Sequence, residues 1–290
     1  MNKEQTEKVL GVAALGPYEA PFGHVGRARV VVLTVIDEEF QAARDVLGLT
    51  KNVPNTPYFV TDCDTKDWDI VLHQSADRTN VPVNEEVSRV LGELRPQLVI
   101  LVGVAGGLCD SKGQGREGID MGDVLIADFV SYVEFLKLDS GVMRSRAYVI
   151  DHPSLPLRRN ISQPLSKYFS IRQNISFEPP RKNAPLRVHI GSIVSGEKIY
   201  GDVDNEIQKQ LLAPFDKALA VDMESIGVAR AICDGRSSFW YHPRYAIIRG
   251  ISDLVDSPKN NKNRAKWKKF SAHAAAVVAK RFIEMFLEVV

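Results

Sequence analysis

The sequence predicts an α/β fold: a single domain whose central twisted sheet is mixed, mostly parallel and flanked by helices. Two observations predict it. The runs RVVVLTVI (residues 29–36) and LVILVG (98–103) are almost wholly apolar, as is typical of strands buried on both faces. Such runs alternate along the chain with segments of helical spacing, an order that places helices over a parallel sheet.

The individual elements follow this alternation. Directly after 29–36, the acidic residues Asp37, Glu38 and Glu39 begin a helix, where negative charge suits the helix dipole. A long helix over 270–289 closes the chain. Between these two, we expect strands at 58–63, 68–75, 98–103, 123–130, 147–150, 186–195, 218–221 and 245–250, and helices at 83–94 and 223–233.

The organisation of the chain is simple. Residues 1–28 are expected to form an N-terminal arm, because Gly and Pro are scattered through them and no period is sustained. Residues 29–290 show no internal repeat or boundary and are expected to form one domain. Two stretches do not fit the alternation: 110–121 is a charged, Gly-rich loop, and 151–185 contains a possible helix followed by a Pro-rich run.

Composition excludes several classes of protein. The net charge of +1 offers no global field for nucleic acid or an anionic membrane, so neither is an expected partner. The three cysteines, Cys63, Cys109 and Cys233, show no CxxC spacing and predict neither a disulfide framework nor a metal site. No apolar run approaches the ~20 residues that span a bilayer. We expect a cytoplasmic protein without a metal or cofactor.

Candidate site residues come from the ends of the predicted strands, because ligands of α/β sheets bind where the strands end. Each also has a structural interpretation: the acidic run can cap a helix, GVAGG (103–107) can be a packing turn, and Met223 can be core. Glu224 can serve the helix dipole and Asp253 can cap a helix. The strand-end residues are Glu39, Ala105, Gly106, Glu197, Lys198, Tyr200, Asp222, Met223, Glu224, Arg249, Ser252 and Asp253.

Taken together and in order, these runs resemble the purine nucleoside phosphorylase/uridine phosphorylase superfamily, most of all its 5′-methylthioadenosine/S-adenosylhomocysteine nucleosidase branch. The matching runs are VVVLTVIDEEF, LVGVAGGL, GDVLIADFV, GSIVSGEKIYGD, ALAVDMESIGVA and IIRGISDLVD. The resemblance implies a nucleoside phosphorylase-like fold and cleavage of the bond between a purine and its ribose.

The resemblance also implies roles for individual residues. Asp253 matches the aspartate that protonates the five-membered ring of the purine. Glu224 matches the glutamate that hydrogen-bonds the ribose hydroxyls, with Met223 against the sugar. Glu39 matches the carboxylate that orients the attacking water, and Arg249 matches the arginine beside that water.

The base is placed by the same resemblance. Ile199 and Tyr200 fall where the family packs and hydrogen-bonds the base. Ser252, Ala105 and Gly106 are expected beside them in the substrate pocket.

Carboxylates suit this chemistry. Breaking an N-glycosidic bond builds positive charge on the ribose and negative charge on the base. A protonated carboxyl can neutralise the base, an ionised one can stabilise the oxocarbenium-like sugar, and a third can take the proton of water. The three carboxylates predicted to be catalytic are Asp253, Glu224 and Glu39.

Water is favoured over phosphate as the nucleophile. Phosphorylases of the superfamily carry a Gly-Asp-Pro-x-Arg-type turn after the first strand and an arginine near the fourth. Here the first turn is acidic and LVILVG has no arginine, so a phosphate dianion would be repelled. The departures from the nucleosidases concern the substrate: Val104 replaces a small hydroxyl residue, and Ile199 replaces a stacking aromatic ring.

Basic residues leave the substrate open. Lys198 and several of the cations in 259–269 either form a solvated helix start or receive a 5′-phosphate or triphosphate. SGEK, RGISDLVD and a final helix containing Trp267 also resemble phosphorylase-superfamily effector domains of bacterial defence and of immune receptors, some of which degrade ATP. The basic residues after the last strand are Lys259, Lys262, Arg264, Lys266, Lys268 and Lys269.

Three functions remain as hypotheses. The first is a nucleosidase that releases adenine from a nucleoside or nucleotide such as methylthioadenosine, S-adenosylhomocysteine, AMP or ATP. The second is a phosphate-dependent phosphorylase, and the third is a nucleotide sensor without turnover. The resemblance further implies a homo-oligomer.

Overall fold

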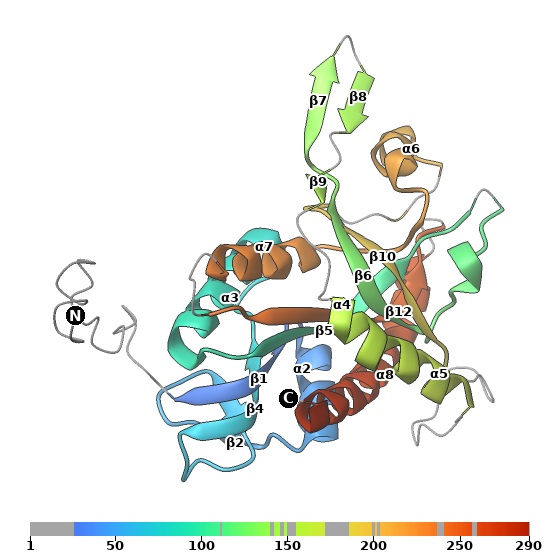
Figure 1. Cartoon of the computed structure of the whole chain (residues 1–290). Coiled ribbons are helices and arrows are strands. Elements are labelled where there is room, and N and C mark those ends of the chain that lie inside the picture. The colour runs from blue at the N-terminus through green and yellow to red at the C-terminus, as the bar shows by residue number, and fades with distance from the viewer. Residues whose placement is uncertain are drawn as a thin grey trace, which may run out of the picture.

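One mixed sheet forms the centre of the protein (Figure 1). The structure is a computed structural model that describes residues 26–110, 112–139, 142–145, 148–149, 155–171, 186–198, 201, 204–236, 241–256 and 260–289. The strands of the sheet are β1 (Arg27–Thr34), β2 (Lys51–Asn52), β3 (Tyr58–Val60), β4 (Asp67–Gln74), β5 (Leu98–Gly107), β6 (Val124–Tyr132), β9 (Tyr148–Val149), β10 (Val188–Ser195), β11 (Ala218–Asp222) and β12 (Arg244–Leu254).

The strands pair in the order β11-β10-β6-β12-β5-β1-β4-β3-β2, with β9 beside β6. The pairs β4–β1, β1–β5, β5–β12 and β6–β10 are parallel, whereas β12–β6 and β3–β4 are antiparallel. The predicted single α/β domain with a mixed sheet is therefore confirmed.

Part of the sheet closes on itself. β11 pairs with β10 on one side and with the end of β5 on the other, where Ala220 and Val221 lie opposite Gly107 and Gly106. β5, β12, β6, β10 and β11 thus form a closed ring of five strands. The closure brings the ends of β5, β11 and β12 close together, and the pocket described below opens there.

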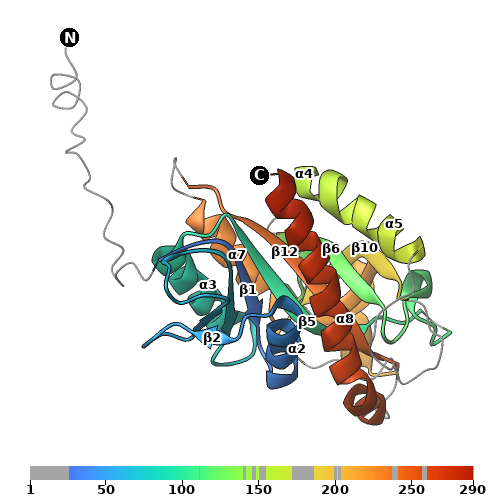
Figure 2. The same ribbon diagram turned by 90° about the horizontal axis from the view of Figure 1, so that it is seen from below.

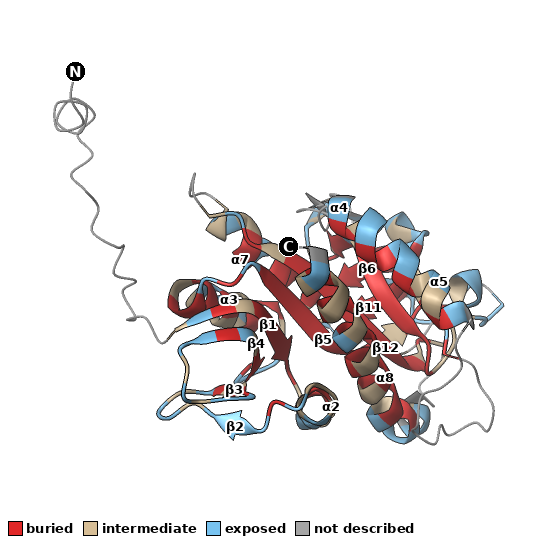
Figure 3. Ribbon diagram, turned by 60° about the horizontal axis from the view of Figure 1, so that its bottom comes forward, coloured by how far each residue is buried: buried red, intermediate tan, exposed pale blue. Residues whose placement is uncertain are grey.

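Side chains of β5 alternate between two cores. Leu98, Ile100 and Val102 pack into one core, whereas Val99 and Leu101 pack into the other. Figures 2 and 3 show helices on both faces of the buried strands. The first core is covered by α2 (Asp37–Leu47), α5 (Gln163–Ile171) and α8 (Asn260–Val289), and the second by α3 (Asn80–Leu94) and α7 (Ser225–Gly235).

Helix α8 packs tightly on β12. A Cβ on Gly250 would lie 2.0 Å from the carbonyl oxygen of Ser271, so the two backbones approach more closely than any side chain at 250 allows. Ser271 Oγ also donates a hydrogen bond of 2.7 Å to the carbonyl of Ile251. Small residues on the buried face of α8 permit this approach: Ala272, Ala274, Ala275, Ala276 and Ala279.

Several predicted boundaries were wrong. β5 continues to Gly107 and β12 to Leu254, so the runs GVAGG and ISD are strand and not turn or helix cap. The physical reason is that these runs pair with each other along their length. α8 begins at Asn260 and not at 270, so most of the basic segment is helical.

Some elements were not predicted. The chain after β6 forms a hairpin, β7 (Leu136–Asp139) and β8 (Val142–Ser145), which stands out from the sheet near α6 (Glu206–Leu212) in Figure 1. The loop 110–121 holds a short 3-10 turn, η1 (Arg116–Gly118). Within 151–185, the possible helix of the sequence analysis is present as α4 (Leu155–Leu157), a π turn, η2 (Arg158–Ser162), and α5; the rest of that stretch is outside the described residues. A further 3-10 turn, η3 (Ala213–Phe215), follows α6.

The predicted N-terminal arm is largely outside the described residues. Residues 1–25 of the predicted arm lie outside the described residues, and β1 begins at Arg27. Among the described helices, none has the length and apolar character to cross a membrane.

Candidate active site

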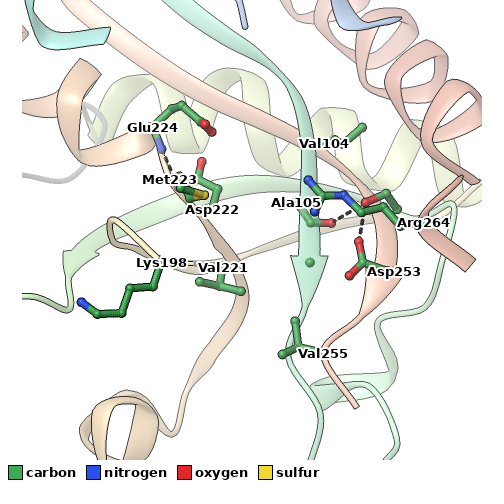
Figure 4. A pocket seen from close by; sticks show the side chains of 12 residues that line it. Val104, Ala105, Lys198, Val221, Asp222, Met223, Glu224, Asp253, Val255 and Arg264 are labelled. Atoms are coloured by element: carbon green, nitrogen blue, oxygen red, sulfur yellow. Dashed lines mark hydrogen bonds between the residues drawn. The ribbon is translucent and has the colours of Figure 1, made fainter. Parts of the chain in front are cut away.

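A pocket opens at the ends of β5, β11 and β12. One wall comes from β11 and the residues after it, and the opposite wall comes from β5, β12 and α8 (Figure 4). The pocket is lined by Val104, Ala105, Gly106, Lys198, Val221, Asp222, Met223, Glu224, Ser252, Asp253, Val255 and Arg264.

A β-bulge turns Asp253 toward the pocket. The register of β12 on β5 shifts between Ile251, which pairs with Ala105, and Asp253, which pairs with Gly106. Ser252 is thus the extra residue of the bulge, a device that re-aims side chains near active sites. Its hydroxyl lies 2.6 Å from Asp253 Oδ1 and 3.4 Å from the carbonyl oxygen of Ala105.

Asp253 is a buried acid. Its exposed fraction is 7%, and burial raises the pKa of its carboxyl above the ordinary value of 3.8. The hydrogen bond from Ser252 and the charge of Arg264 lower this pKa, and Asp256 raises it, but the net shift is upward. A carboxyl of this kind is suited to hold a proton and donate it.

Arg249, behind the pocket, is fully buried and surrounded by carboxylates. Its Nε and Nη2 donate to Asp222 Oδ2 at 2.9 and 2.6 Å, and Nη2 also donates to Glu224 Oε2 at 2.9 Å. Burial lowers the pKa of Arg249, but Asp222, Glu224 and Glu39 together outweigh burial and raise it, so the guanidinium stays charged.

Glu39 is both a helix-capping residue and part of this cluster. Its Oε2 accepts hydrogen bonds from the backbone N–H groups of Val35 (2.9 Å) and Ile36 (3.2 Å), so the structural interpretation of the acidic run is correct as far as it goes. Its Oε1 accepts from the N–H of Val104 at 2.8 Å and lies 3.8 Å from Arg249 Nη1. Glu39 is thereby fixed with one oxygen toward Arg249.

Arg249 Nη1 is a buried donor that makes no hydrogen bond to another described residue. A Cβ on Gly103 would lie 2.4 Å from both Nη1 and Glu39 Oε1, so only glycine leaves these two groups in place. A buried donor and a carboxylate oxygen therefore lie 3.8 Å apart, a separation that a hydrogen-bonded water can bridge.

The sequence placed Glu224 within the helix 223–233. In the structure it precedes the helix and is the N-cap residue of α7. Asp222 Oδ1 accepts from the backbone N–H groups of Glu224 (3.4 Å) and Ser225 (3.2 Å) and so does the capping. The Glu224 side chain is left to face the pocket and Arg249. Burial raises the pKa of Glu224 to about 7, an effect that Arg249 opposes and that Asp222 and Glu39 reinforce.

Two of the predicted basic residues line the pocket, and the other described ones do not. Arg264 lines the pocket from α8, and Lys198 lines it from the segment after β10 while forming an ion pair with Glu134. Lys268 pairs instead with Glu38 on α2 at 2.6 Å. The remaining described lysines on this stretch are exposed: Lys262, Lys266 and Lys269. Lys259 lies outside the described residues.

The structure brings most of the predicted site together. Asp253, Ser252, Ala105, Gly106, Met223, Glu224 and Lys198 line the pocket, and Glu39 and Arg249 lie behind it. Ile199 and Tyr200, predicted to hold the base, lie outside the described residues. Asp222, the last residue of β11, was named among the strand-end residues but was given no role, and Gly103 was included only in a possible packing turn, because the lack of a side chain gives no signal by itself.

The sequence of the chain is similar to a known family and to individual nucleosidases. The profile of the Phosphorylase superfamily matches residues 29–287. The chain is 27% identical over 276 residues to "ATP nucleosidase Cap17" of Escherichia coli (strain KTE188), covering 88% of this chain and 51% of that protein. It is 24% identical over 192 residues to a 5′-methylthioadenosine/S-adenosylhomocysteine nucleosidase of Staphylococcus aureus (strain MRSA252), covering 66% and 71%.

The fold is also shared with solved structures. The 5′-methylthioadenosine/S-adenosylhomocysteine nucleosidase of Neisseria meningitidis in complex with methylthio-immucillin-A superposes with a TM-score of 0.65 at 19% identity, covering 89% of this chain and 99% of that one. The chain spans about half the length of the E. coli relative, 51% of it.

Proposed function

The chain belongs to the phosphorylase superfamily, and on that premise we propose that it hydrolyses the N-glycosidic bond of an adenine nucleoside or nucleotide and releases adenine. The observation that carries the proposal is the pairing of a protonatable acid with a separate cluster of carboxylates around one buried cation. Asp253 and Glu224 line opposite walls of the pocket, and behind it Arg249 binds Glu224 and lies 3.8 Å from Glu39.

Asp253 donates a proton to the departing base. Its raised pKa keeps the carboxyl protonated more readily than an exposed aspartate, and such a proton transfer is worth about 10²–10⁴-fold in rate. Ser252 holds one carboxyl oxygen and so fixes the direction in which the other points.

Glu224 receives the ribose, and Met223 lies beside it in the pocket lining. As the glycosidic bond breaks, positive charge develops on the sugar, and an ionised Glu224 stabilises that charge. Glu39 and Arg249 Nη1 hold the attacking water, which donates to the carboxylate and accepts from the guanidinium.

Water is the nucleophile for an electrostatic reason. In the described part of the site, Arg249 is already engaged by Asp222, Glu224 and Glu39, and its single positive charge leaves an excess of negative charge. A phosphate dianion at that position would face three carboxylates and a cation that they already engage. The alternative, a phosphate-dependent purine nucleoside phosphorylase, is disfavoured on this ground.

The adenine compound is the least constrained part of the proposal. Lys198 and Arg264 are the cations that line the described pocket and could receive substrate phosphates. The E. coli relative is an ATP nucleosidase by name and the S. aureus relative a methylthioadenosine/S-adenosylhomocysteine nucleosidase, so both nucleotides and nucleosides are candidates. Degradation of ATP would suit the defence role that the sequence resemblance implies. We further propose a cytoplasmic homo-oligomer.

One experiment tests these alternatives. Purified protein in phosphate-free buffer is incubated with methylthioadenosine, S-adenosylhomocysteine, adenosine, AMP, ATP and dATP, and base release is followed by chromatography. We expect adenine from at least one compound without phosphate. Release that requires phosphate and yields ribose 1-phosphate would overturn hydrolysis. Tight binding of a compound with no base release from any would favour the nucleotide sensor.

A further inference from the structure

Gly106 leaves an open space in the pocket beside the proposed proton donor. A Cβ at this position would lie 2.8 Å from Val255 Cγ2, 3.6 Å from Val221 Cγ1 and 3.7 Å from Asp253 Oδ2. Figure 4 shows these three side chains around the pocket. Asp253 and Val255 are two residues apart on an extended chain, so both side chains point to the same face. A base that accepts the proton of Asp253 therefore lies in this space, which we call the base slot.

Val255 lines a second cavity as well as the pocket that holds the base slot. Its exposed fraction is 1%, so its side chain fills the space between the two. The second cavity has a volume of about 300 Å³, against about 70 Å³ for the pocket. It lies between Leu108 and Cys109, which follow β5, and Leu212 and Ala213, at the end of α6. Val255 therefore separates a small space from a larger one.

The walls of the second cavity favour an apolar occupant. Leu108, Leu212 and Val255 belong to one hydrophobic cluster, and Cys109 beside them is buried. Three polar side chains of the cavity already have partners in the protein. They are Asp110, with the backbone N–H groups of Lys112 and Gln114, Gln208, with that of Gly201, and Lys209, with Glu206. An alkyl or aryl group would therefore meet apolar surface there without displacing a polar contact.

Arg116 makes the second cavity a fixed part of the fold. Its Nη1 donates to the carbonyls of Phe215 at 2.7 Å and Ala218 at 3.0 Å, and its Nε donates to that of Cys109 at 3.2 Å. The loop 110–121, which does not fit the alternation of strands and helices, is thereby tied to η3 and β11. It supplies part of the cavity wall.

The side chain of Val255 is held in place between the two spaces. Its backbone N–H donates to the carbonyl of Gly107 at 2.8 Å, so the pairing of β12 with β5 continues one residue past Leu254. A β-branched side chain also has few rotamers. Val255 therefore cannot turn aside for a larger base, and its size decides how far the base slot extends.

We propose that Val255 is a specificity-determining residue, a partition that confines the base slot to an unsubstituted purine and closes it off from the apolar cavity behind. The proposal rests on the proposed function, because that function places the five-membered ring of the base at Asp253. The six-membered ring is then the part that extends toward Val255. The ligand that a shorter side chain at 255 would admit is a purine with an alkyl or aryl group on its six-membered ring.

The test is the equilibrium binding of three free bases, adenine, N6-benzyladenine and 2-phenyladenine, measured by calorimetry on the wild type and on Val255→Ala. The wild type should bind adenine more tightly than either substituted base. In Val255→Ala the affinity ratio should move toward at least one substituted base by about tenfold or more, because the apolar group gains a place to be buried. An unchanged ratio for both, or no preference for adenine in the wild type, would overturn the proposal.

Val221→Ala is the matched control. It removes the same two methyl groups from the base slot, but Val221 does not line the second cavity. The affinity ratio in this variant should stay within about threefold of the wild type, since no further space is opened. A shift equal to that of Val255→Ala would mean that the slot has simply been widened, and it would overturn the role of Val255 as a partition.

A second variant tests whether the substituent enters the second cavity. Ala213 lines this cavity and is exposed, so a bulky side chain there can fill the cavity with little disturbance of the core. The double variant Val255→Ala/Ala213→Trp should lose the gain in affinity for the substituted base. A gain that persists would show that the substituent lies elsewhere and would contradict the proposal.

Val255→Cys covers the case in which Val255→Ala does not fold. It removes less volume and keeps an apolar side chain at the same place, so it should shift the affinity ratio in the same direction by less. No shift in Val255→Cys would then overturn the proposal.

The outcomes separate this proposal from the proposed function, because the binding of a free base needs no turnover. If the wild type binds adenine but cleaves no substrate, the proposed function fails, and the affinity ratios still decide the role of Val255. If substrates are cleaved and the ratio does not respond to position 255, only the present proposal fails.

Discussion

The two sides of the pocket hold carboxylates in opposite circumstances. Around Arg249, three acidic side chains share one fully buried cation, and backbone N–H groups hold Glu39 and Asp222 in place. Asp253 has one hydroxyl partner, and Arg264, the cation that lowers its pKa, is only partly buried. The difference shows that the surroundings of a carboxyl group, and not its chemistry alone, decide how readily it holds a proton.

The largest effect is expected at Asp253, the proposed proton donor. Asp253→Asn keeps the shape of the side chain but removes the proton, so base release should fall about 10²–10⁴-fold. Binding of a slowly cleaved substrate should stay within a few-fold, because the rest of the pocket is untouched. Single-turnover base release and equilibrium binding would be measured together. Unchanged turnover would refute the acid role of Asp253.

The Arg249 side should respond with lost stability. Arg249→Met leaves two buried carboxylates, Asp222 and Glu39, and the partly buried Glu224 without a cation, which should cost about 3–5 kcal/mol of unfolding free energy. Arg281→Met, which breaks the partly exposed pair of Arg281 with Glu284 on α8, is the control and should cost less than about 1 kcal/mol. Urea unfolding of both variants gives the comparison. Equal losses would mean that the buried cluster is not held together by its cation.

Gly103→Ala separates geometry from charge on the same side. The new methyl group would press on Arg249 Nη1 and Glu39 Oε1, both 2.4 Å from it, and should cost about 1–3 kcal/mol of stability along with most of the activity. Gly201→Ala is the matched control, since a Cβ there meets none of the described atoms within 4 Å. Activity retained in Gly103→Ala would show that the water site does not depend on this contact.

The smallest effect is a slope of stability with pH. The pKa of Glu224 is raised in the fold from 4.5 to about 7, so between these values the folded protein binds more protons than the unfolded chain. The contribution of Glu224 is therefore fully present below pH 4.5 and is lost as the pH rises through 7. The stability of the wild type relative to Glu224→Gln should fall across this window in pH-dependent urea unfolding. A flat difference would show that the pKa of Glu224 is not raised.

The two sides also differ in how far the sequence could predict them. The carboxylates could be located because each follows an apolar run, and the topology of an α/β sheet brings strand ends together. Asp253 was placed at a strand end for that reason, but the bulge at Ser252 that aims it depends on the register between β5 and β12. Register is a contact between distant segments, and neither strand carries it alone.

Arg264 and Val255 show the same limit from other directions. Six basic residues between 259 and 269 look alike in the sequence, and only the path of α8 decides that Arg264 lines the pocket. Val255 carries no signal, because the second cavity that it lines is built from distant segments, the loop after β5 and helix α6. The fold follows from local patterns, whereas the support of the site follows from long-range contacts.

Helix α8 packs against the core on one face and also contributes Arg264 to the wall of the pocket. Its buried face is pressed against β12 at Gly250 and Ser271, and the same rigid element carries Arg264 to the pocket wall. A lineage adapting to a new substrate on this side could not move the helix without disturbing the core. It would have to replace side chains at positions such as 264. The exposed lysines beside it can be substituted with little effect on stability. The position of the backbone of α8 is thus fixed by the core, whereas the character of this pocket wall is set by single side chains.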